Sequence, residues 1–133
     1  MSTPVVSIRF SIVGEEFDPN DITKSLGITP TAQNSHHRIY CPKTQQYRNE
    51  SYWSIETQKA KTWDIACFLA SLIERLAPYK DEIIKVSKQL DARIMVVVNL
   101  DLNGTNGPGM CLGPETLRFL ADIGASYDVD ICV

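Results

Sequence analysis

The segment "FDPNDITKSLGITPT" (residues 17–31) decides the fold, because it contains both the start and the end of one short helix. Asp18 suits the N-cap, where a carboxylate accepts a hydrogen bond from a first-turn amide, and Pro19 suits the first helical position. Gly27 is typical of the residue that ends a helix, and Pro30 prevents the helix from resuming. The segment therefore predicts a helix of about two turns.

Two apolar residues attach this helix to a neighbouring strand. Phe17 and Ile22 occupy the hydrophobic-staple positions, which set the angle at which the chain enters a helix. Residues 5–13 alternate between apolar and polar side chains, which predicts a half-buried strand whose polar face carries Arg9. We therefore interpret Phe17 to Gly27 as a structural clasp that holds the helix on a sheet, rather than as the rim of an active site.

A second helix near the other end of the chain repeats this pattern. Pro114 again stands at the first helical position, and Gly124 again ends the helix. Leu112 and Leu117 have the same separation as the first pair of staple residues. Strand-like segments flank both helices, so we expect two strand–helix–strand units of similar design.

The middle of the chain adds a strand and two helices. Residues 51–57 alternate around Trp53, which predicts a strand with this tryptophan in the core. Residues Ile65 to Leu76 have apolar side chains at helical spacing over a wide stripe, and a second helix follows Pro78. Such a stripe predicts either a central helix packed on two sides or a helix that forms a homodimer.

These elements predict a single α+β domain over residues 1–133. We expect a mainly antiparallel sheet of about five strands with helices on one face, in the order β-α-β-β-α-α-β-α-β. The remaining segment, residues 32–50, is polar and irregular, and we expect a long loop with at most a short strand at residues 36–41.

Composition and charge disfavour several classes of function. The net charge is −3 and the 13 basic residues are interleaved with acidic ones, whereas nonspecific nucleic-acid binders usually carry a basic stripe. The longest apolar stretch, residues 65–70, is too short to cross a bilayer, and the first residues do not resemble a secretion signal. The four cysteines have no metal-binding spacing, which favours reduced thiols. We therefore expect a cytoplasmic protein that binds neither nucleic acid nor membranes.

The polar loop supplies most of the residues that we predict to bind a partner. Arginine and tyrosine are enriched at the energetic centres of protein interfaces. The predicted binding residues are Arg9, His36, His37, Arg38, Tyr40, Tyr47 and Arg48. Adjacent histidines on a strand point to opposite faces, and no fourth ligand accompanies them and Cys41, so we expect no metal or other cofactor.

Other reactive side chains have structural explanations. Asp128 and Asp130 share one face of the last strand, where acidic residues discourage pairing at a sheet edge, although paired carboxylates also bind cations. Cys67 falls on an apolar helix face and is expected to be a buried thiol. Cys111 precedes the second capped helix and is the better candidate for a reactive thiol, because helix N-termini lower thiol pKa values.

Four segments together resemble a known family. They are "F-x-I-x-G" (residues 10–14), the capped helix (17–31), "YWSIET" (52–57) and "LRFLADIGASYDVDI" (117–131). The combination resembles the bacterial domain-of-unknown-function family 4279. The resemblance implies a small bacterial cytoplasmic α+β protein, and it supplies no activity and no catalytic residues.

The sequence leaves two classes of function open. We expect a non-enzymatic protein-binding or regulatory module of a bacterial cell, such as an immunity protein, because no complete catalytic set is present. The alternative is a small hydrolytic or metal-dependent enzyme that uses His36 and His37 or the carboxylates of Asp128 and Asp130.

Overall fold

The computed structural model describes residues 2–133, apart from the side chains of His36 and His37. The elements in chain order are β1 (Val5–Gly14), α1 (Pro19–Leu26), β2 (Ala32–Cys41), β3 (Gln46–Glu56), β4 (Ala60–Lys61), α2 (Ile65–Leu76), the 3-10 turn η1 (Ala77–Tyr79), α3 (Lys80–Gln89), β5 (Arg93–Asp101), α4 (Pro114–Asp122) and β6 (Ala125–Cys132). The chain is an α+β protein, as predicted.

The strands form one mixed, mainly antiparallel sheet in the order β2-β3-β1-β5-β6, with the short β4 paired to the start of β1. Every neighbouring pair is antiparallel except β5 and β6, which are parallel. Strands β1 and β2 are therefore parallel with β3 between them, and β3 and β5 are parallel with β1 between them. This is the split β-α-β arrangement of ferredoxin-like folds, extended by α4 and β6 at one edge.

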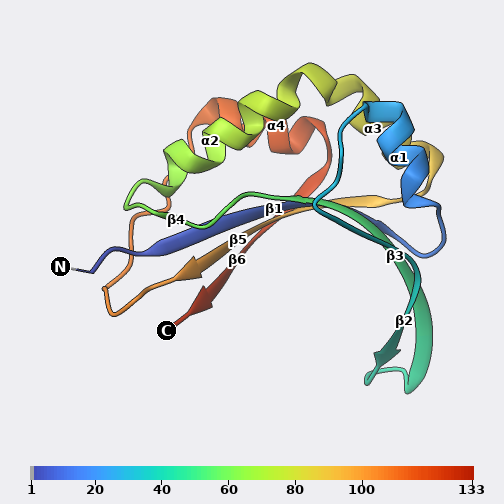
Figure 1. The fold of residues 1–133 in the computed structure, drawn as a ribbon, viewed down its shortest axis with the longest axis horizontal. Coiled ribbons are helices and arrows are strands. Elements are labelled where there is room, and N and C mark those ends of the chain that lie inside the picture. The colour runs from blue at the N-terminus through green and yellow to red at the C-terminus, as the bar shows by residue number, and fades with distance from the viewer. Residues whose placement is uncertain (1) are drawn as a thin grey trace.

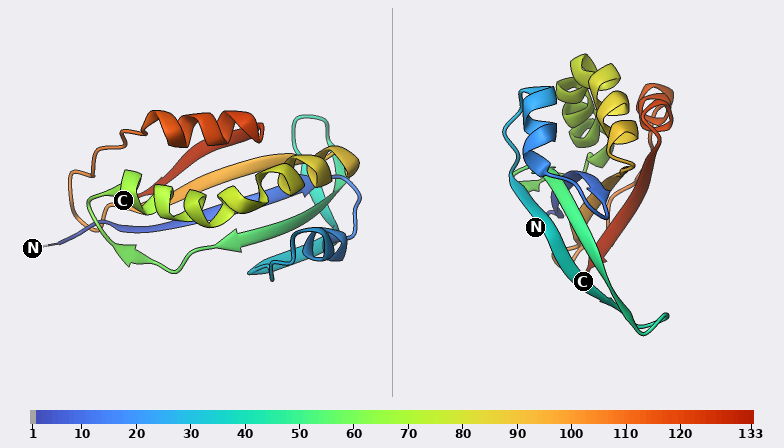
Figure 2. Two further views of the ribbon diagram at one scale, coloured as in Figure 1. Left: turned by 90° about the horizontal axis from the view of Figure 1, so that it is seen from above. Right: turned by 90° about the vertical axis from the view of Figure 1, so that its right-hand side faces the viewer.

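The helices of the described chain all lie on one face of the sheet (Figures 1 and 2). The predicted clasp around α1 is confirmed. The side chain of Asp18 accepts a hydrogen bond from the Asn20 amide at 3.0 Å, and Gly27 has the left-handed φ of 71° that glycine tolerates best. Phe17 and Ile22 are both buried. Local capping chemistry thus places α1 on the sheet.

The apolar stripe of helix α2 packs against the core of the same chain. Ile65, Leu69, Leu72 and Leu76 belong to the core that packs on the sheet. The sequence left open whether this stripe packs within the chain or forms a homodimer. Packing within the chain accounts for its buried residues. Homodimerisation through α2 stays a prediction. Cys67 is exposed, so the prediction of a core thiol was wrong: it stands about 200° around the helix from Ile65, outside the buried stripe.

The predicted long loop over residues 32–50 was also wrong. These residues form the hairpin of β2 and β3, with a register shift between Asn34 and His37. The hairpin bends away from the helices and projects beyond the sheet (Figure 1). Most side chains near its tip face solvent on both sides, so the apolar alternation that marks a half-buried strand is missing.

The two strand–helix–strand units differ more than expected. Gly124 ends the second unit's helix with a φ of 71°, as predicted, but Leu117 is 52% exposed and forms no staple. Strands β5 and β6 of this unit are adjacent, whereas β3 separates the two strands of the first unit.

Within residues 2–133, no helix combines the length and the apolar character that crossing a bilayer requires.

Candidate functional site

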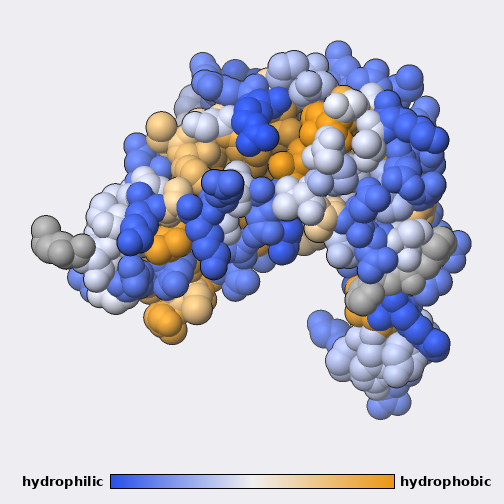
Figure 3. Space-filling view, viewed as in Figure 1, coloured by the Kyte–Doolittle hydropathy of each residue, from blue (hydrophilic) through white to orange (hydrophobic). Residues whose placement is uncertain are grey.

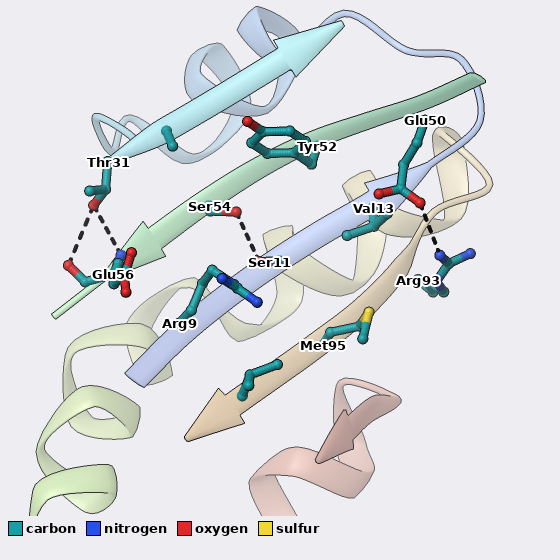
Figure 4. Close-up of a pocket in the computed structure, with 12 residues that line it drawn as sticks. Arg9, Ser11, Val13, Thr31, Glu50, Tyr52, Ser54, Glu56, Arg93 and Met95 are labelled. Atoms are coloured by element: carbon teal, nitrogen blue, oxygen red, sulfur yellow. Dashed lines mark hydrogen bonds and ion pairs between the residues drawn. The ribbon is translucent and has the colours of Figure 1, made fainter. Parts of the chain in front are cut away.

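The candidate site is the face of the sheet opposite the helices. Alternate residues of β1, β3 and β5 line a cavity of about 440 Å³ there (Figure 4). The lining residues are Arg9, Ser11, Val13, Thr31, Ala32, Glu50, Tyr52, Ser54, Glu56, Arg93, Met95 and Val97. The bent β2–β3 hairpin makes this face concave, and the space-filling view shows the molecule hollowed beneath its body, beside the projecting hairpin (Figure 3).

The strand register arranges the floor of the cavity in rows. Ser11 on the central strand lies between Ser54 on β3 and Met95 on β5, and the two serine hydroxyls are 2.8 Å apart and hydrogen-bonded. One row further along, Val13 lies between Tyr52 and Arg93. The middle of the face thus combines two hydroxyls with an apolar surface and one aromatic ring.

One end of the cavity carries a charge cluster. Glu50 lies 3.5 Å from the guanidinium of Arg93 and 3.4 Å from that of Arg48. Two cations therefore share one carboxylate, and the cluster keeps a net positive charge. Exposed ion pairs of this length contribute little to stability, so ligands can compete for the two arginines.

Arg9 occupies the other end of the cavity. It lies on the central strand in register with Glu56 on β3 and Val97 on β5. No acidic oxygen within the described part of the chain lies in salt-bridge range of Arg9, and no hydrogen-bond acceptor contacts it. Figure 4 shows its side chain extending away from Glu56, over the floor of the cavity. Among the described residues, Arg9 thus has no counter-ion on the open face.

The structure divides the predicted binding residues between two surfaces. The guanidinium of Arg38 lies 4.3 Å from the ring centre of Tyr47, whose ring centre is 5.2 Å from that of Tyr40. Because side chains alternate along β3, this group shares the side of Trp53, which faces the helices. Arg9 and Arg48 lie on the opposite, concave side of the sheet.

The backbone of both histidines belongs to the hairpin. Both belong to β2, and His37 pairs with Glu50 on β3, while the side chains of His36 and His37 lie outside the described residues. Their predicted role in binding or metal chemistry therefore stays a prediction. Among the described side chains, no three from histidine, cysteine, aspartate and glutamate gather closely enough to hold a metal ion.

The remaining reactive candidates are exposed and separate. Asp128 and Asp130 point outward from the edge strand β6, on the same sheet face as Arg9, and Cys111 is exposed before α4. Cys41 lies near the tip of the β2–β3 hairpin. A hydrogen bond from the side chain of Thr44 holds the pKa of Cys41 below its ordinary value.

Sequence reasoning missed most of the cavity. Only Arg9 had been predicted among its lining residues, whereas Tyr52, Ser54, Arg93 and Met95 had not. A signal was present: the polar face of residues 5–13 carries Ser7, Arg9 and Ser11 between Val5 and Val13.

The topology and the open face define the class of protein. It is an α+β domain with a split β-α-β core, helices on one side of its sheet, and a concave surface on the other. The family model described as "Domain of unknown function (DUF4279)" matches residues 4–133, and the chain belongs to this family, as the sequence motifs predicted. Searches of curated proteins and of solved structures found no match.

Proposed function

We propose that the protein is a non-enzymatic binding module that holds part of a partner protein against the concave face of its sheet. The supporting observation is the cavity of about 440 Å³ opposite the helices, built on the rigid strands β1, β3 and β5. Ordered strands fix the positions of the contacting side chains before binding, which lowers the entropic cost of association.

The chemistry of the face suits a protein partner. Tyrosine, arginine and methionine are enriched at protein interfaces, and the cavity presents Arg9, Tyr52, Arg93 and Met95. The hairpin extends the surface beyond the body of the sheet (Figure 1). A regulatory or immunity role, in which one protein blocks another by contact, requires such a surface and no reacting groups.

Site-specific photo-crosslinking tests this proposal. A benzophenone amino acid replaces Met95 in the cavity, and a matched variant carries it at Glu74, which is exposed on α2 on the other side of the sheet. After irradiation in the native cell, we expect a discrete adduct from position 95 that is reduced when Tyr52 is also changed to alanine. Equal adducts from both positions, or adducts from position 74 alone, would contradict the proposal.

A further inference from the structure

We propose that the partner segment held in the cavity is an acidic peptide, whose carboxylate binds the guanidinium of Arg9. This inference rests on the proposed function, and it names the chemistry that the concave face recognises. The argument begins with the contrast between the arginines on this face. Arg48 and Arg93 both contact Glu50, whereas Arg9 has no ionic or hydrogen-bonding partner among the described residues.

A partner carboxylate suits the unpaired guanidinium. Arginine presents its donors in a planar fork that matches the two oxygens of a carboxylate. Glu56 is the nearest acidic residue in register, yet its carboxylate is beyond salt-bridge range and the side chain of Arg9 extends away from it (Figure 4). The donors of Arg9 therefore stay available to a ligand that enters the cavity.

The two serines provide further donors beside Arg9. Ser11 follows Arg9 by two residues on the same face of β1, a spacing of about 7 Å along a strand. In the bond between Ser11 and Ser54, one hydroxyl hydrogen is used and the other is left to donate. A carboxylate over this part of the floor thus meets both a cation and a neutral donor.

The rest of the cavity floor indicates which type of residue follows the acidic residue in the bound peptide. Met95 lies beside Ser11, about 7 Å along the strand direction from Arg9, and Val13 and the ring of Tyr52 lie one row further along. In an extended peptide, side chains two residues apart project to the same side about 7 Å apart. The face therefore suits an acidic residue, any residue, and then an aliphatic or aromatic residue.

The far end of the cavity favours a second acidic residue. There the two guanidinium groups of Arg48 and Arg93 share the single carboxylate of Glu50. A compact small molecule would leave this cluster unused, because Arg9 and the cluster stand at opposite ends of the face. An extended peptide reaches from one to the other, which is why we choose a peptide as the occupant.

Methyl NMR with a defined probe tests the inference. The protein, labelled with ¹³C at the methionine methyl groups, is titrated with acetyl-Glu-Ala-Leu-amide and with the matching peptide that carries glutamine instead of glutamate. Met95 reports on the cavity, and Met110 lies outside its lining and serves as an internal control. We expect the Met95 signal to shift with the acidic peptide, and the glutamine peptide to bind about tenfold more weakly.

Three variants separate the role of Arg9 from general charge effects. R9Q should weaken binding of the acidic peptide about tenfold and leave binding of the glutamine peptide nearly unchanged. R118Q, which removes an exposed arginine from α4 on the helix side, changes the net charge equally and should have little effect. E56Q should strengthen binding of the acidic peptide, because it removes a carboxylate beside the site.

The outcomes distinguish this inference from the proposed function. If both peptides shift Met95 equally, or R9Q and R118Q behave alike, the assignment of an acid to Arg9 is wrong while the binding face stands. If acetyl-glutamate amide alone binds as tightly as the tripeptide, the occupant is a small carboxylate and the peptide assignment is wrong. If no probe shifts Met95 although position 95 crosslinks to a partner, the acidic motif is refuted and the proposed function survives.

Discussion

The hydrogen bond between Trp53 and Thr23 should contribute measurably to stability, because it joins the core of the sheet to α1. The indole of Trp53 is fully buried, and its ring packs edge-on against Phe10 with centroids 6.5 Å apart. Its Nε1–H donates to Thr23 Oγ1 at 3.0 Å. The clasp formed by α1 is therefore anchored by a core side chain as well as by its own caps.

The size of this contribution follows from ordinary energetics. Trp53→Ala would cost about 3–5 kcal/mol, a large part of the roughly 5–15 kcal/mol that stabilises a typical domain. The milder Trp53→Phe removes the donor and part of the ring, and Thr23→Val removes the acceptor while keeping the shape of the side chain. A double-mutant cycle over these two changes should give a coupling energy of about 1 kcal/mol.

Urea denaturation followed by far-UV circular dichroism measures this coupling. Tryptophan fluorescence is unsuitable, because Trp53→Phe removes one fluorophore and leaves only Trp63, which is 51% exposed. The four unfolding free energies of the cycle should show that the second substitution costs less once the first is present. Strictly additive costs would refute the idea that this bond anchors α1.

Three further predictions concern the backbone, a thiol and an edge strand. Gly27→Ala should lower the free energy of unfolding by about 1–2 kcal/mol, because its φ of 71° strains a residue with a Cβ. Cys41 should be alkylated by iodoacetamide at lower pH than an ordinary thiol, because its lowered pKa gives more thiolate at a given pH, and Thr44→Val should move the pH profile upward. Replacing Asp128 and Asp130 together with valine should cause concentration-dependent association, seen by light scattering, because uncharged edge strands pair with one another.

Matched positions control these three experiments. Gly109→Ala should be nearly neutral, since Gly109 lies outside the helices, has no positive φ and has open space around it, and an equal loss at both glycines would contradict the strain argument. Cys67 is exposed and serves as the reference thiol for alkylation. Glu74→Val on α2 adds an apolar side chain away from any strand edge, so association of this variant as well would argue against edge pairing.

The elements predicted best were those whose signals are local in sequence. Helix α1 followed from Asp18, Pro19 and Gly27, which act on the backbone within a few residues of themselves. The central strand followed from its alternation, but the prediction that it is half-buried was wrong, because both faces of β1 are buried except at Arg9 and, in part, Val5. The positions of both elements could be predicted without knowledge of the strand order.

The features that were missed depend on contacts between distant segments. The β2–β3 hairpin pairs polar residues that are exposed on both faces, so periodicity gave no indication of it. The predicted binding residues were divided between two faces of the sheet because strand register, like the hairpin, depends on contacts between distant segments. Because side chains alternate along paired strands, the register of β1 with β3 puts Arg9 on the same face as Ser54 and Tyr52, whereas Tyr40 and Tyr47 lie on the other face of the hairpin.

The yield of crosslinked adduct from position 95, relative to that from position 74, tests most directly whether the concave face is where the protein works. Position 95 replaces Met95 on the floor of the cavity, and position 74 replaces Glu74 on the helix side. We predict a ratio well above one, with the adduct mapped to a single partner. A ratio near or below one would mean that the open face of the sheet is not the binding surface.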